Sequence, residues 1–516
     1  MYANPSKESY RSLPYSRRTF RPARRPESRL RVRAFGTLLS CLLPLLLACA
    51  AQTITNAQDM SAQMSVVSLS PPRVRVEGSR ASATKSWSFR HSYAGISLAD
   101  RLENLSLKDA SGADVPVRRL APGEYEAERP ATRFSYHVRL EPPLDTSSAA
   151  HLSWLTDGYG VLMPGDLLPL PATHASLRFD LPADWRLSTS EPPTATLGYS
   201  VKDAEDTIFF IGRNLRERQT RSSEGVRCTF VTTGDWAFDD EEASDAVSDI
   251  LKEHASILGG APAGRLLVVL APFPLPASAQ MWSAETRGRT VFLLSGRWPA
   301  KATALAQLNV PLTHELLHLW VPNALALDGE YDWFYEGFTL YQSMRVGVRL
   351  GHLTFQDYLN ALGRAHDNYR AARGLKELSL LEASERRWSG ATSLVYNKGM
   401  LVAALYDLTL RLQTSNKNSL DDVYRELFRR YTSEANRRTG NDAVIKLLGS
   451  MRGMQSFTQS YVRGSEALDL ASVVEPFGLR VETSGARTRL VVSPMLSRQQ
   501  RELLRKLGYN ETRRAA

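Results

Sequence analysis

The segment Pro311–Val321, which reads P-L-T-H-E-L-L-H-L-W-V, constrains the fold more than any other part of the chain. His314 and His318 are four residues apart, so on an α-helix they share one face and both imidazoles can reach a single ion. Pro311 fits the first turn of that helix, where its missing N–H is not needed. The remaining positions are apolar: Leu316, Leu317, Leu319 and Trp320. Because burying polar groups without partners is costly, this apolar helix predicts a metal bound in the core.

Glu315 stands beside the first histidine, where a carboxylate can take a proton from water without competing for the metal. A catalytic zinc also needs a third protein ligand and one open position. The next helix begins near Trp333–Thr339, W-F-Y-E-G-F-T, with Asp332 as a candidate cap. Packed antiparallel to the first helix, it places Glu336 opposite the two histidines. The sequence therefore predicts a Zn²⁺ site made by His314, His318 and Glu336, with Glu315 as general base.

Short alternating runs separated by Pro and Gly precede this region and predict an antiparallel β domain over residues 67–235, after a linker at 52–66. Three examples are Arg73–Glu77, Phe134–Leu140 and Ala175–Leu181. The histidines of this half lie far apart without the spacing of metal ligands, and we interpret them as strand or loop residues: His91, His137, His151 and His174.

The pattern changes to helix at Asp239, where four consecutive acids favour the first turn of a helix that ends at Gly259-Gly260. Strands are expected at Arg265–Leu270 and Arg289–Ser295, and helices dominate from about Thr303 to Gly464. This order predicts an α+β chain with a mainly helical catalytic domain over 236–470. Residues 471–516 should form a hairpin and a last helix.

The first 51 residues have the order of a bacterial export signal, a basic stretch followed by the apolar run Ala34–Ala51. Leu46–Cys49 resembles a lipobox, which would place a lipid anchor on Cys49, whereas Ala48–Ala50 also fits ordinary signal peptidase. Ser16–Phe20 resembles a twin-arginine motif. The alternative to cleavage is a retained signal anchor. The chain is therefore expected in the cell envelope or periplasm.

The net charge of +10 does not indicate nucleic-acid binding, because most of the basic excess lies in this leader. Residues 1–50 carry ten Lys and Arg against two Glu, so the rest of the chain is nearly neutral. A phosphate-binding surface needs its basic excess on the folded domain. We therefore expect no nucleic-acid partner.

Four blocks of the sequence resemble the gluzincin peptidases, most closely the glycyl aminopeptidase family M61. They are H-E-L-L-H-L-W, W-F-Y-E-G-F-T-L-Y, Tyr396-Asn397-Lys398-Gly399 and Ser419–Leu427, in the order of that family. The resemblance implies a β-rich domain followed by a thermolysin-like catalytic domain whose edge strand, at Gly288–Ser295 by position, binds extended peptide. It also implies that Tyr396 stabilises the tetrahedral intermediate, a role suited to a phenol donor. The expected activity is zinc-dependent peptide hydrolysis.

The sequence departs from the family pattern at three places. Seventeen residues separate His318 from Glu336, one fewer than in the aminopeptidase-N-like pattern. No block like Gly-Gly-Leu-Glu-His precedes the zinc helix, and Glu285 is the nearby acid. The tail is too short to show a PDZ domain. Two alternatives therefore stand beside an aminopeptidase: a zinc hydrolase of a non-peptide bond, and a non-catalytic envelope protein that keeps zinc for structure.

Overall fold

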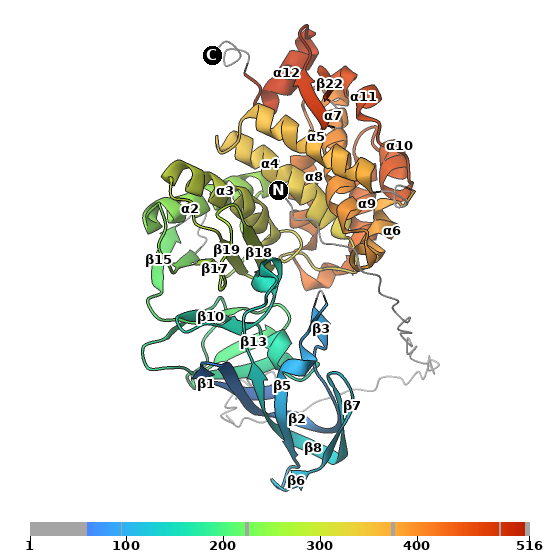
Figure 1. The fold of residues 1–516 in the computed structure, drawn as a ribbon. Coiled ribbons are helices and arrows are strands. Elements are labelled where there is room, and N and C mark those ends of the chain that lie inside the picture. Colours follow the sequence, from blue (N-terminus) through green and yellow to red (C-terminus); the bar gives the residue numbers. More distant parts are fainter. Residues whose placement is uncertain (1–58, 94, 222–226, 373–376, 485–486, 511–516) are drawn as a thin grey trace, which may run out of the picture. The chain divides into compact units, whose positions relative to one another are not determined.

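A computed structural model describes residues 59–93, 95–221, 227–372, 377–484 and 487–510. β-Sheets make up the amino-terminal part and helices dominate the carboxy-terminal part (Figure 1), which confirms the predicted α+β class. The leader predictions, including Cys49 and the twin-arginine motif, fall outside the described residues. No helix in the described ranges has the length and apolar character needed to cross a membrane.

The larger amino-terminal sheet has eight strands. In spatial order they are β13 (Tyr199–Asp203), β11 (Thr173–Asp180), β1 (Met60–Leu69), β2 (Pro72–Ser88), β8 (Glu124–Arg139), β5 (Leu102–Lys108) and β6 (Asp114–Val115), with β7 (Val117–Ala121) paired to β8. The predicted linker at 52–66 is wrong from Met60 onward, because Met60, Ala62 and Met64 alternate as buried residues of β1. β1 also pairs in parallel with β11, so the sheet is not purely antiparallel as predicted.

A smaller four-stranded sheet packs between this sheet and the carboxy-terminal part of the chain, which begins at Arg216. It comprises β12 (Arg186–Ser188), β14 (Phe209–Gly212), β10 (Tyr159–Leu162) and β9 (Trp154–Leu155). Phe209 and Ile211 pack into the core of the larger sheet, whereas Phe210 packs with Leu267 and Phe292 of the next sheet. The alternation of one strand, β14, therefore links two cores.

The carboxy-terminal part begins with a five-stranded sheet in the order β15 (Arg216–Arg221), β16 (Arg227–Thr232), β17 (Arg265–Pro272), β19 (Thr290–Ser295) and β18 (Trp282–Arg287). Because β15 and β16 belong to this sheet, it starts before the predicted boundary at 235/236. The predicted edge strand at Gly288–Ser295 is also wrong, since β19 is interior and β18 occupies the edge. Both faces of β19 are buried, which explains why its four central residues, Val291 to Leu294, are all apolar.

Helices α2 (Asp240–Leu258) and α3 (Lys301–His318) cover one face of this sheet (Figure 1). Asp239 and Glu242 form a capping box at the start of α2, and Gly259 ends it with a φ of 80°, as the sequence predicted. Pro311 does not lie in a first turn, because α3 begins ten residues earlier and contains Pro311 in its interior. The prediction failed because the helix start at Lys301 carries no side-chain cap.

The remaining helices form a bundle beside α3. The main ones are α4 (Thr339–Arg349), α5 (Phe355–Ala371), α6 (Leu380–Glu385), α7 (Gly399–Gln413), α8 (Leu420–Tyr431) and α9 (Gly440–Ser450). Smaller turns are α1 (Pro164–Leu167), α10 (Gln455–Thr458), α11 (Leu470–Val473) and the π-helical turns η3 (Trp333–Phe338), η5 (Leu394–Lys398) and η7 (Gln459–Arg463). The predicted tail is confirmed as β22 (Leu479–Ser484), β23 (Arg487–Val492) and α12 (Arg498–Lys506).

Two glycines let η3 and η5 approach each other closely. A Cβ added to Gly337 would lie 2.6 Å from the Gly399 Cα, and one added to Gly399 would lie 2.9 Å from the Gly337 Cα. An alanine at either position would therefore force the two backbones apart. This close crossing brings Glu336 of η3 and Tyr396 of η5 to the same site.

Candidate active site

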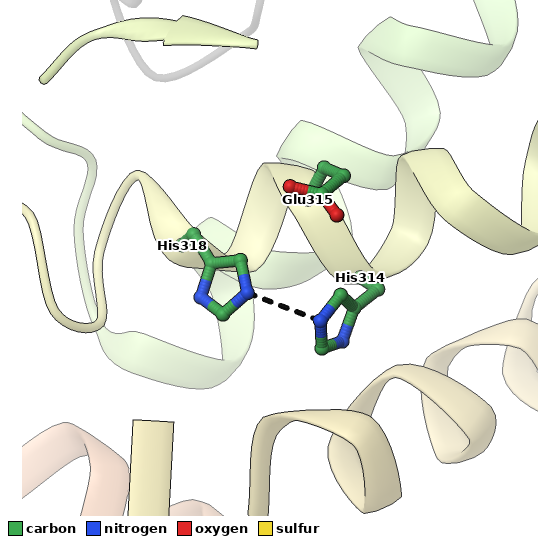
Figure 2. A group of neighbouring side chains, drawn as sticks. All are labelled: His314, Glu315 and His318. Carbon is green, nitrogen blue, oxygen red and sulfur yellow. Dashed lines mark hydrogen bonds between the residues drawn. The ribbon is translucent and has the colours of Figure 1, made fainter. Parts of the chain in front are cut away.

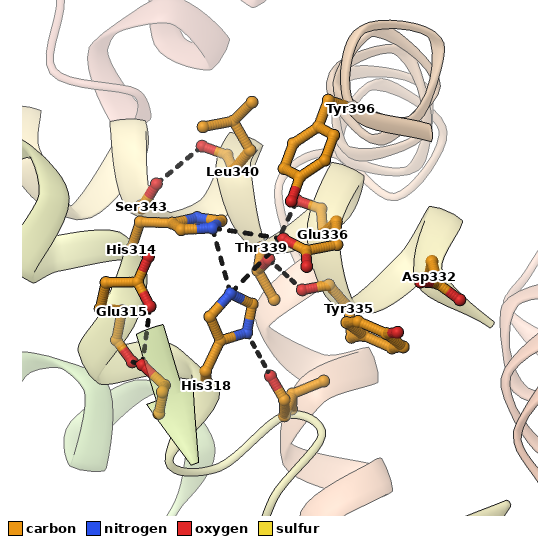
Figure 3. A network of polar contacts seen from close by, with 12 residues as sticks. His314, Glu315, His318, Asp332, Tyr335, Glu336, Thr339, Leu340, Ser343 and Tyr396 are labelled. Atoms are coloured by element: carbon orange, nitrogen blue, oxygen red, sulfur yellow. Dashed lines mark hydrogen bonds and ion pairs between the residues drawn. The ribbon is translucent and has the colours of Figure 1, made fainter. Parts of the chain in front are cut away.

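His314, His318 and Glu336 converge as the sequence predicted. Both histidines project from α3 (Figure 2), and their Nε2 atoms are 3.1 Å apart. The Glu336 Oε2 lies 3.5 Å from the His314 Nε2 and 3.6 Å from the His318 Nε2. Figure 3 shows the carboxylate facing both rings from the neighbouring helix. The three side chains are 11%, 9% and 10% exposed, so the site is largely removed from water.

These separations fit a tetrahedral zinc site. Donors bound to zinc at 2.0–2.2 Å with tetrahedral angles are about 3.3 Å apart. The structure brings the three donor atoms to 3.1–3.6 Å from one another before any ion is considered. Lone pairs of two nitrogens and one carboxylate would repel at this distance unless a cation or a proton lay among them. The residues therefore fit a divalent cation, and imidazole with carboxylate suits zinc.

The tautomer of one ligand is set by its backbone neighbour. The Nδ1 of His318 lies 3.0 Å from the Val321 carbonyl oxygen, which can only accept, so this nitrogen carries the hydrogen. The Nε2 lone pair of His318 is then free for a metal. The Nδ1 of His314 is buried and has no hydrogen-bond partner among the described residues.

The charges of the site favour an ionised carboxylate. Burial opposes the charge on Glu336, but hydrogen bonds from His314 and His318, with the charges of His318 and Arg387, hold its pKa well below the usual range. Burial likewise opposes the charge on His318, but Glu336 outweighs it and raises the His318 pKa to about 9. The carboxylate is thus in the form that binds metal, and a metal must displace a proton from the pair.

Glu315 lies close to the ligands but is held by a different partner. Its carboxylate is within 4.8 Å of the donor nitrogens of His314 and His318. The Thr286 hydroxyl donates to the Glu315 Oε2 at 2.7 Å. Thr286 belongs to the edge strand β18, so Glu315 is positioned beside the edge of the sheet. Glu336 therefore fits a ligand, and Glu315 fits a general base.

Tyr396 also reaches the site from η5 (Figure 3). Its hydroxyl accepts a hydrogen bond from the Arg387 Nη2 at 2.9 Å, and the same nitrogen donates to the Glu336 Oε1 at 3.0 Å. Burial and the charge of Glu336 raise the Tyr396 pKa well above its ordinary value, although Arg387 opposes this. The phenol therefore stays protonated and can donate to a developing oxyanion.

The backbone that carries these groups differs from the expected α-helix. Glu336 and Tyr396 both lie in π-helical turns, η3 and η5, each of which leads into an α-helix. Such turns re-aim side chains and are frequent at functional sites. Asp332 stands at the N-cap of η3, but its side chain does not cap this turn as predicted, because its carboxylate accepts from the Arg387 Nη1 at 2.5 Å instead. No sequence pattern signals either feature.

Sequence reasoning missed a charged cluster at the edge of the sheet. Glu285 lies on β18 rather than in a loop, and its carboxylate bonds the Nδ1 of His151 and the Nε of Arg287, the latter at 3.0 Å. The Tyr93 ring stacks on His151 with centroids 5.5 Å apart. Burial opposes the charge of Glu285, but His151 and Arg287 lower its pKa to about 2. His151 is therefore no ordinary loop histidine, and its separation of 134 residues from Glu285 hid the pair.

Residues 308–402 match the sequence model of the M61 glycyl aminopeptidase family. The match contains both histidines, Glu315, Glu336, Arg387 and Tyr396. No curated protein matches the chain.

Solved structures share the fold. An aminopeptidase N family protein from Idiomarina loihiensis matches with a TM-score of 0.69 and 18% identity, over 82% of this chain and 79% of its own. An M1 zinc metallopeptidase from Deinococcus radiodurans matches with a TM-score of 0.52 and 15% identity, over 80% of this chain and 95% of its own. A mutant of that enzyme bound to a Tyr-Ser-Ala substrate has a TM-score of 0.52 and 14% identity, with coverage of 80% and 94%.

Proposed function

We propose that the chain is an M61 glycyl aminopeptidase-like metallopeptidase, which hydrolyses peptide bonds with zinc held by His314, His318 and Glu336; the family match over residues 308–402 supports this. The convergence of three donor atoms within 3.6 Å of one another supports this proposal most strongly. When bound, zinc supplies a Lewis acid that polarises the scissile carbonyl and lowers the pKa of water.

The other residues of the site supply proton transfer and charge stabilisation. Glu315, held by Thr286, accepts a proton from the attacking water and delivers it to the leaving amine. Tyr396 donates its phenolic hydrogen to the oxyanion as the carbonyl becomes tetrahedral. Both roles match the positions of these side chains on opposite sides of the histidine pair (Figure 3).

The edge strand β18 favours an extended peptide as the substrate. Among the described residues, β18 lies at the edge of its sheet and has β19 as its one neighbouring strand. A peptide added there would be held by main-chain hydrogen bonds and would pass the Thr286–Glu315 contact. The Tyr-Ser-Ala substrate of the Deinococcus radiodurans neighbour is consistent with this class of ligand.

We propose further that residues are removed from the amino end. Glu285 is the carboxylate next to Thr286 on β18, and a substrate ammonium could take the place of His151 against it. The amino end of the peptide would then stop at the cluster of Glu285, His151 and Tyr93. An aminopeptidase of this kind agrees with the family match.

Incubation of the purified protein with a mixed peptide library, followed by mass spectrometry, tests these proposals. We expect shortening from the amino end, loss of cleavage after removal of metal by a chelator, and recovery when zinc is added back. Internal cuts would support peptide hydrolysis but contradict the removal of residues from the amino end. A zinc-loaded protein that leaves every peptide intact would contradict peptide hydrolysis and favour a non-peptide substrate or a binding role.

We also propose that the chain is exported to the bacterial cell envelope and carries a lipid on Cys49. The basic and apolar order of residues 1–51 and the lipobox-like Leu46–Cys49 support this. Mass spectrometry of the protein purified from its cells is expected to find a mature chain that begins at a lipid-modified Cys49. An unmodified amino terminus beyond Cys49 would indicate ordinary signal peptidase, and an intact leader would contradict export with cleavage.

A further inference from the structure

Arg387 contacts three groups of the active site from the short 3₁₀ turn η4 (Arg387–Ser389). Its Nη1 donates to the Asp332 Oδ1 at 2.5 Å. Its Nη2 donates both to the Glu336 Oε1 at 3.0 Å and to the Tyr396 hydroxyl at 2.9 Å. One nitrogen thus joins a predicted metal ligand to the predicted oxyanion donor.

Hydrogen bonds from both Nη atoms and contacts with two aromatic rings hold the guanidinium in place. Its side chain is 12% exposed, and its central carbon lies 4.8 Å from the Trp388 ring centre and 5.5 Å from that of Tyr396. Aromatic faces attract a guanidinium and restrict it to one plane. The Asp332 contact fixes the other end of the group. Arg387 is therefore a rigid bridge and not a mobile surface charge.

The bridge has a consequence for each partner. Because Arg387 occupies the Glu336 Oε1, the Oε2 that faces both histidines is the oxygen left for a cation. The Tyr396 oxygen accepts from Arg387, and the phenol also hydrogen-bonds the Glu336 side chain, so these two partners together fix the position of the hydroxyl. The positive charge also offsets the repulsion between the carboxylate and a developing negative charge beside it.

We propose that Arg387 is a positioning residue that raises the zinc affinity through Glu336 and aims the Tyr396 hydroxyl for catalysis. The second role rests on the proposed peptidase function, whereas the first concerns metal binding alone. Partners that orient metal ligands contribute about 10–100-fold to metal affinity or activity. A lysine could not replace the bridge fully, since an ammonium lacks the planar fork that reaches Asp332 and Glu336 together.

The test compares Arg387→Ala and Arg387→Lys with Arg386→Ala, a matched control at the exposed neighbouring arginine. Zinc affinity is measured by competition with a chelator, and coordination by the visible spectrum of the Co²⁺-substituted protein. We expect Arg387→Ala to bind zinc about 10–100-fold more weakly with an altered Co²⁺ spectrum. Arg387→Lys should be intermediate, and Arg386→Ala should match the wild type. Zinc affinity and a Co²⁺ spectrum unchanged in both Arg387 variants would overturn the first role.

The second role is measured at saturating zinc. Arg387→Ala should lower kcat more than it raises KM, because it disturbs a contact made in the transition state. In a Tyr396→Phe background the same change should cost far less, since the hydroxyl that Arg387 aims is gone. Equal losses in both backgrounds would overturn the aiming role. A wild type that binds zinc yet cleaves no peptide would contradict the proposed function and leave the affinity result to stand by itself.

Discussion

Replacing Glu315 by glutamine should abolish most peptide hydrolysis while leaving zinc bound. The amide keeps the size of the side chain and can still bond Thr286, but it cannot accept a proton. General-base catalysis contributes about 10²–10⁴-fold, so kcat should fall by that amount with little change in KM. Steady-state kinetics on a peptide substrate and metal analysis of the same preparation measure both quantities.

Zinc content is the internal control of this experiment. A variant that keeps about one zinc per chain and loses activity shows that Glu315 acts on the reaction and not on metal binding. A glutamine variant as active as the wild type would exclude Glu315 as the base. A variant that loses its zinc would instead assign Glu315 to the ligand set, a reading that its distance within 4.8 Å of both histidine nitrogens permits.

Replacing Glu336 by alanine should release the metal. Glu336 supplies the one carboxylate oxygen among the described residues that forms ion-pair contacts with both histidine nitrogens, at 3.5 and 3.6 Å. Since a catalytic zinc is held by three protein ligands, loss of one should weaken zinc binding by more than about 100-fold, beyond the effect of an indirect partner. Activity should disappear at ordinary zinc concentrations, measured by metal analysis after dialysis and by peptide cleavage.

Glu330→Ala is the matched control for this change. Glu330 lies six residues earlier on an exposed stretch, so its loss should alter neither zinc content nor cleavage. A Glu336→Ala protein that still holds zinc after dialysis would assign the third ligand to another residue. The variant is also expected to have a lower thermal stability, because the largely buried Arg387 loses one of its two carboxylate partners.

The convergence of His314, His318 and Glu336 could be predicted from the sequence because it depends on local spacing, whereas their roles stay predictions. His314, Glu315 and His318 lie on one helical turn, and the helix period alone brings the two rings together. The predicted position of Glu336 depended only on the next helix packing against α3, and the structure confirms this packing. Tyr396 was reached through the family resemblance, and the structure places it in the same network.

The features that could not be predicted from the sequence depend on contacts between segments that are far apart in the chain. Arg387 and the pair of His151 with Glu285 follow no spacing, since chain topology alone brings them together. The π-helical turns at Glu336 and Tyr396 lie beside the close crossing of Gly337 and Gly399, a tertiary contact that the sequence alone does not reveal. Pro311 was misplaced because proline is common in first turns and the true helix start has no side-chain cap.

The fold shows the same division. α2 was predicted with both ends because its capping acids and Gly259 are local signals. β1 was missed because Met60, Ala62 and Met64 alternate with small polar residues in a segment that follows a leader. The edge strand was misassigned because strand order within a sheet is set by tertiary pairing and not by sequence order.

X-ray diffraction at the zinc absorption edge, from crystals of the zinc-loaded protein, tests directly whether His314, His318 and Glu336 bind the same zinc ion. We expect one anomalous peak about 2.0–2.2 Å from the Nε2 atoms of His314 and His318 and from one Glu336 oxygen. An absent peak, a peak elsewhere, or a Glu336 side chain turned away from both rings would contradict it.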